Sequence, residues 1–118
     1  MSRALAVFTV QARGIKVGVR VLPTIADVDA AFRVGASMRS RRRVHAFFHA
    51  PKGGAGTIVL PADGRLTELV PHEVVHVVMR ADGGPQHADA DEELALSVGL
   101  LSTAIFTELC RRGIEVRP

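Results

Sequence analysis

The pentapeptide His72-Glu73-Val74-Val75-His76 contains the residues whose types and spacing point most directly to chemistry. Two histidines four residues apart on a helix lie on the same face, one turn apart. Their imidazoles can then share one zinc ion, and the intervening glutamate can sit beside the water bound to that ion. The pattern therefore predicts a zinc site with His72 and His76 as ligands.

Glu73 is the candidate catalytic residue of this predicted site. A carboxylate beside the metal can take a proton from the activated water and later return it to the leaving group. The motif thus favours a hydrolase that cleaves a peptide or protein substrate. A purely structural interpretation competes with it: His72 at a helix start, His76 as a buried hydrogen-bonded side chain, and Glu73 as a first-turn acid favoured by the helix dipole.

A catalytic zinc ion also needs a third protein ligand and an open position for water. Glu92 is the predicted third ligand, because it opens the next apolar segment after a loop long enough for an antiparallel return. Asp91 and Glu93 project about 100° to either side of it on a helix, so only one of the three acids should reach the metal. His87 is a further alternative, although its glycine-containing loop positions it poorly.

The elements that must position these side chains follow from the hydrophobic pattern. Alternating apolar residues predict a hairpin, and Thr24 caps the helix that follows it. A second pair of strands then flanks a glycine-rich turn. The expected ranges are strands at 4–10, 15–21, 44–50 and 57–60, and a helix at 25–35.

Two long helices are predicted in the last third of the chain. The first starts at Thr67 or Val70 and runs to about Arg80, with Pro71 tolerated only in its first turn. The second covers residues 91–112, and residues 114–116 are a possible short strand. We therefore expect one α+β domain spanning residues 1–118. It has a small, mostly antiparallel sheet of about four strands, a crossing helix and two C-terminal helices, the first carrying the histidines.

Composition narrows the range of functions. The 118 residues include one cysteine and no Trp or Tyr, and the net charge is +3. No signal peptide is recognisable, and the apolar run at 94–107 is shorter than the ~20 residues of a membrane span. A cytoplasmic protein without membrane contact is expected. Nucleic acid is an unlikely partner, since the arginine run at 39–43 has no aromatic residues interleaved. The oligomeric state does not follow from the sequence.

His45 and His49 fall on the same face of the strand expected at 44–50. Such a pair can line a cleft beside the metal. The pattern is more typical, however, of two polar side chains that face solvent opposite an apolar face.

The segment Pro71–His76, followed by Asp91-Glu92-Glu93 and the apolar stretch to Ser102, resembles small phage or prophage proteins with a minimal zincin core. The resemblance covers about the last fifty residues. It implies a gluzincin-like metallopeptidase fold in miniature. It also implies zinc ligation by His72, His76 and Glu92, with Glu73 as the base. The acidic triplet departs from the acidic pair of those proteins, which keeps Glu93 as an alternative.

Two other functions remain open from the sequence. One is a non-catalytic binding module of a mobile element with the same fold, since the chain is short for a peptidase. The other is a small nucleic-acid-associated protein that uses its arginine run.

Overall fold

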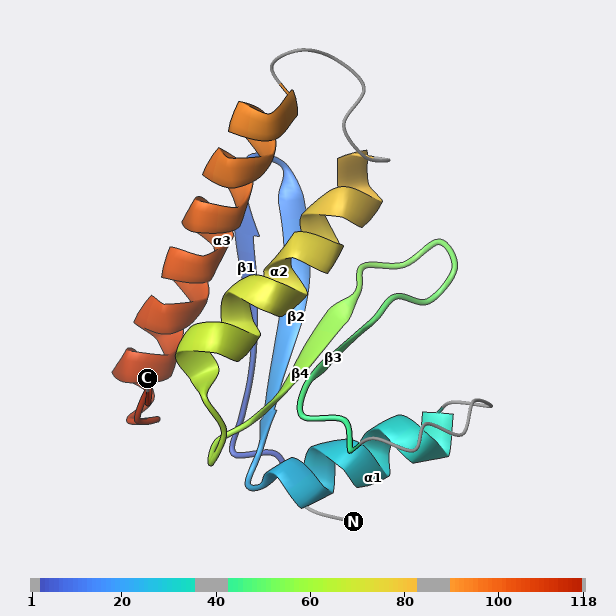
Figure 1. Cartoon of the computed structure of the whole chain (residues 1–118), viewed down its shortest axis with the longest axis vertical. Coiled ribbons are helices and arrows are strands. Elements are labelled where there is room, and N and C mark those ends of the chain that lie inside the picture. The colour runs from blue at the N-terminus through green and yellow to red at the C-terminus, as the bar shows by residue number, and fades with distance from the viewer. Residues whose placement is uncertain (1–2, 36–42, 83–89, 118) are drawn as a thin grey trace.

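Within the described residues, the chain forms a four-stranded mixed sheet, a helix after the second strand and two C-terminal helices (Figure 1). The structure is a computed structural model that describes residues 3–35, 43–82 and 90–117. The predicted α+β class, with its crossing helix and its pair of C-terminal helices, is confirmed.

Strands β1 (Ala6–Ala12) and β2 (Ile15–Leu22) form the predicted hairpin. The turn between them places Arg13 and Gly14 at φ values of 51° and 77°. Positive φ at both central residues matches the right-handed twist of the flanking strands. Alternation along the strands points one set of side chains into the core, including Phe8, Val17 and Val19.

Helix α1 (Ile25–Gly35) begins at a reciprocal cap. The Asp27 amide donates to Thr24 Oγ1 at 3.1 Å, and the Thr24 amide donates to Asp27 Oδ2 at 3.1 Å. Each bond satisfies a backbone donor that the first helical turn leaves free. Val28 then packs against Leu22 and Val59 on one face of the sheet, so α1 covers the end of that face.

The strand on the other side of β2 runs parallel to it and is the second strand after α1 in the chain. This strand is β4 (Thr57–Pro61), and β3 (Phe47–His49) pairs antiparallel with β4 at the edge. The order is β1-β2-β4-β3. Two of the three pairings are antiparallel, as the prediction of a mostly antiparallel sheet requires.

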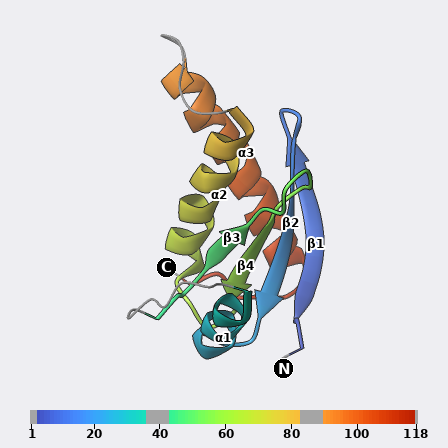
Figure 2. The ribbon, with the colours of Figure 1, turned by 90° about the vertical axis from the view of Figure 1, so that its right-hand side faces the viewer.

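Helices α2 (Leu66–Asp82) and α3 (Ala90–Arg111) pack side by side on the other face (Figure 2). The core between them and the sheet includes Val17, Val19, Ile58, Leu60, Leu66, Val70, Val74, Leu101 and Ile105. Helix α2 starts at Leu66, so Pro71 lies in its second turn and not in its first. The possible strand at 114–116 does not form; instead, the Arg117 carbonyl accepts the Thr67 hydroxyl at 3.2 Å.

Candidate metal centre

His72 and His76 lie one turn apart on α2, and their rings meet edge to face. The ring centres are 5.1 Å apart, with an angle of 74° between the planes. Two imidazoles that bind one tetrahedral zinc ion through nitrogens about 2.0–2.1 Å away have centres roughly 5.2 Å apart. The spacing of the ring centres is therefore compatible with one shared zinc ion. Both side chains are exposed, so an ion can reach them from solvent.

Glu73 lies on the buried side of the same turn and is 5% exposed. Its Oε2 is 3.9 Å from His72 Nε2. Burial raises the pKa of Glu73, because removal from water disfavours the charged carboxylate, while His72 and His76 act in the opposite direction. A raised pKa brings the carboxylate closer to the range in which a general base works at neutral pH.

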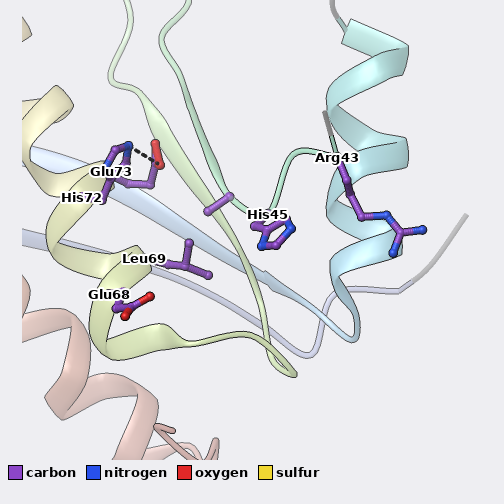
Figure 3. A pocket seen from close by; sticks show the side chains of 7 residues that line it. Arg43, His45, Glu68, Leu69, His72 and Glu73 are labelled. Atoms are coloured by element: carbon purple, nitrogen blue, oxygen red, sulfur yellow. Dashed lines mark ion pairs between the residues drawn. The ribbon is translucent and has the colours of Figure 1, made fainter. Parts of the chain in front are cut away.

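An open cavity of about 420 Å³ lies between α2 and the chain that enters β3 (Figure 3). Its lining residues are Arg43, His45, Ala46, Glu68, Leu69, His72 and Glu73. Figure 3 shows His72 and Glu73 projecting from α2 toward β3 and β4, with His45 on the other side. The cavity thus joins the motif helix to the edge of the sheet.

The wall that carries His45 is fixed through Asp29 of α1. Asp29 Oδ1 accepts the Val44 amide at 2.9 Å, and Oδ2 accepts Arg33 Nε at 2.9 Å. Two hydrogen bonds lower the pKa of Asp29, the one from Arg33 more strongly than the one from the Val44 amide. The carboxylate therefore stays charged at neutral pH and ties the entry to β3 to α1.

The structure does not bring Glu92 to the histidine pair. Across residues 3–35, 43–82 and 90–117, no three His, Cys, Asp or Glu side chains form a group able to hold a metal ion. Glu92 is exposed in the first turn of α3. His87 lies outside the described residues, as does the side chain of Asp91. The identity of a third ligand stays a prediction.

Glu92 lies away from the histidines because the sheet edge and α3 pack on opposite flanks of α2. Arg80, one turn after His76, donates from Nη2 to the Pro51 carbonyl at 3.4 Å, so this stripe of α2 faces the β3–β4 connection. Helix α3 packs against α2 and β1, on the opposite side (Figure 1). Two helices placed this way direct the histidines and the start of α3 to different surfaces.

The sequence singled out three other features, namely His45, His49 and the arginine run. His45 lines the cavity, whereas His49 is exposed and is not among the lining residues. Of the arginine run, only Arg43 is described, and it also lines the cavity. Glu68 also lines the cavity, although the sequence patterns did not single it out. Its position four residues before His72 puts both on one helix face, which is a signal that the sequence carried.

No protein-family model matches the chain, and it has no significant match among the curated proteins or the solved structures.

Proposed function

We propose that this chain is a zinc-dependent hydrolase that cleaves amide bonds in a peptide or protein substrate. The observation that carries the proposal is the grouping on α2 of two adjacent imidazoles and a buried carboxylate. His72 and Glu73 open onto a cavity of about 420 Å³, which is in the size range of small-ligand sites. The resemblance of the last fifty residues to phage zincin proteins supports the same function.

His72 and His76 are the residues that would hold the metal. A bound zinc ion supplies Lewis-acid activation of a water molecule and of the substrate carbonyl. Glu92 remains the predicted third ligand from the sequence, with Asp91, Glu93 and His87 as alternatives. Coordination by Glu92 requires the first turn of α3 to approach the histidine flank of α2.

Glu73 takes the proton from the attacking water and returns it to the leaving amine. Its burial on the helix holds the carboxylate beside His72, and the neighbouring protein atoms keep bulk water from competing for it. His45, across the cavity, can donate a hydrogen bond to a substrate carbonyl. Leu69 offers an apolar contact on the α2 wall.

The test is Glu73→Gln, which keeps the size of the side chain but removes the base. Zinc content should stay equal to that of the unaltered protein, and cleavage of an unstructured protein such as casein should fall by at least about 100-fold. Glu115→Gln is the matched control, because Glu115 is exposed near the C-terminus and far along the chain from the site. If Glu73→Gln cleaves at the original rate, Glu73 is not the base.

A non-catalytic metal-binding or peptide-binding module is the second candidate. It is favoured by one observation: the described side chains offer two histidines but no third ligand grouped with them. Zinc bound by His72 and His76 without cleavage of any substrate in a broad peptide library would select this function.

A further inference from the structure

The outer face of α3 is apolar and has no partner element in the described chain. Leu96 is 50% exposed and Leu100 is 44% exposed. Ala95, Gly99 and Thr103 are exposed beside them. A Cβ atom built on Gly99 meets no atom within 4 Å, so contacts within the described chain do not account for a glycine in mid-helix. In Figure 1, α3 lies at the rim of the molecule, with α2 as its neighbouring helix.

The segment Glu92–Arg111 has a mean hydropathy of 1.5 in its most apolar window, and only 28% of that window is buried. Length and composition alone would allow it to cross a membrane. The inner face of α3 argues against that use, because Leu101, Ile105 and Leu109 are completely buried in the core. Insertion would remove these side chains from the sheet. An apolar partner on the outer face leaves the fold intact.

Charge along α3 indicates what that partner is. The helix begins with the exposed Glu92 and ends with Arg111, whose side chain is 70% exposed. These two residues are roughly 29 Å apart along the axis. A second α3 placed antiparallel puts each acidic end against a basic end, whereas a parallel copy puts like charges together. The midpoint between them lies beside Leu100 and Thr103, so the apolar stripe falls at the centre of such a pair.

We propose that two copies of this chain associate through the outer faces of their α3 helices, in antiparallel orientation. Leu100 of each copy packs against Thr103 of the other at the centre, and Leu96 lies about 8 Å along the axis from it. The small side chains of Gly99 and Thr103 let the two backbones approach closely. Glu92 of each copy lies near Arg111 of the other. The cavity beside α2 opens on the opposite flank and stays accessible, so the pairing does not depend on the proposed hydrolysis.

Sedimentation velocity over a concentration series tests the pairing. It is performed in EDTA so that metal binding does not contribute. The unaltered protein should change from monomer to dimer as its concentration rises. Leu100→Glu should raise the dissociation constant at least about tenfold, since it places a charge at a desolvated centre. Leu96→Glu serves as a second variant, in case one substitution disturbs folding. Val34→Glu on α1, where Val34 is 82% exposed, is the matched control and should leave association unchanged.

Charge reversal tests the orientation. Glu92→Arg and Arg111→Glu should each weaken the dimer, and the two substitutions in one chain should restore it. Arg111 is also paired with Glu108 of its own chain at 3.2 Å, so Arg111→Glu loses this contact, whereas Glu108 keeps its ion pair with Arg112. A protein that stays monomeric at every concentration overturns the proposal, and so does a dimer insensitive to both leucine substitutions. Single reversals without effect exclude the antiparallel arrangement. Co-sedimentation with anionic lipid vesicles would instead assign the face to a membrane.

Discussion

Glu73 is buried in the fold and is also the proposed base. Burial raises the pKa of its carboxyl, so the folded state holds the proton more tightly than the unfolded chain does. The stability that this carboxyl contributes is complete below its ordinary pKa of 4.5 and is lost as the pH rises through the folded-state pKa. Ionisation of Glu73 at neutral pH therefore destabilises the metal-free protein.

Glu73→Gln should remove this penalty. In metal-free protein the variant should melt at a higher temperature than the unaltered chain at pH 8. The difference should shrink steadily as the pH falls through the folded-state pKa and below 4.5, where the carboxyl becomes protonated in both states. Thermal melts followed by circular dichroism in EDTA measure this. A difference in melting temperature that does not change with pH would show that the buried charge does not cause it.

Much of this site could be predicted from residue spacing alone, but its third ligand could not. The positions of His72, Glu73 and His76 on one helix follow from local periodicity. Whether Glu92 joins them depends on which flank of α2 the next helix takes. That choice is made by packing against β1, over contacts remote in sequence. Arg43 and His45 reach the cavity for a similar reason, because Asp29 holds the entry to β3 beside α1.

At the level of the elements, Asp29 connects α1 to the wall of the cavity. Its depressed pKa means that the stability it contributes is present above its ordinary value of 3.8 and is lost as the pH falls through the lower folded-state pKa. Asp29→Ala should lower the melting temperature at pH 7 and weaken peptide binding through disorder of the His45 wall. The stability difference should disappear in strong acid.

Asp29→Asn separates the two bonds that Asp29 makes, because its amide oxygen can still accept the Val44 amide while the ion pair with Arg33 is lost. We expect a smaller loss of stability at pH 7 than for alanine, and this loss should also disappear in strong acid, where the unaltered Asp29 is protonated. Equal melting temperatures for Asp29→Ala and the unaltered protein at pH 7 would contradict the role given to this carboxylate.

Alanine substitutions at two glycines test two effects separately: close packing at Gly56 and helix propensity at Gly99. A Cβ atom at Gly56 overlaps the Phe48 ring and lies 3.1 Å from the His49 carbonyl, so Gly56→Ala must move the Phe48 side chain and shift the edge strand β3 slightly. We expect a loss of about 1–3 kcal/mol in the free energy of unfolding. Gly99→Ala meets no atom and should gain up to about 1 kcal/mol in dilute, monomeric protein. Urea denaturation measures both; a neutral Gly56→Ala would mean that β3 moves freely.

The elements themselves were largely predictable, because the hairpin, α1 and both long helices follow from apolar periodicity and from the Thr24 cap. The predicted start of α2, at Thr67 or Val70, was too late because it placed Pro71 in the first turn. The helix begins at Leu66. A proline at the sixth helical position is tolerated here because Leu66 and Val70, which precede it, are completely buried. Tertiary packing thus outweighs the local preference.

On the scale of the whole molecule, the fold presents two separate surfaces. The cavity lies between α2 and the sheet edge at β3, and the apolar stripe lies on the far side of α3. The core between them holds α2 in register with the sheet, so the histidines stay on the flank that opens to solvent. The two proposals therefore use different surfaces: metal and substrate on one side, and a second copy on the other.

Zinc titration of chelator-stripped protein by isothermal calorimetry tests the central claim most directly. We expect one zinc ion per chain in the unaltered protein and in His49→Ala, which removes a histidine that does not line the cavity. His72→Ala and His76→Ala should each weaken zinc binding by at least about tenfold, because each removes one ligand. Binding of the same strength in all four proteins, or no binding in any, would contradict a metal centre on α2.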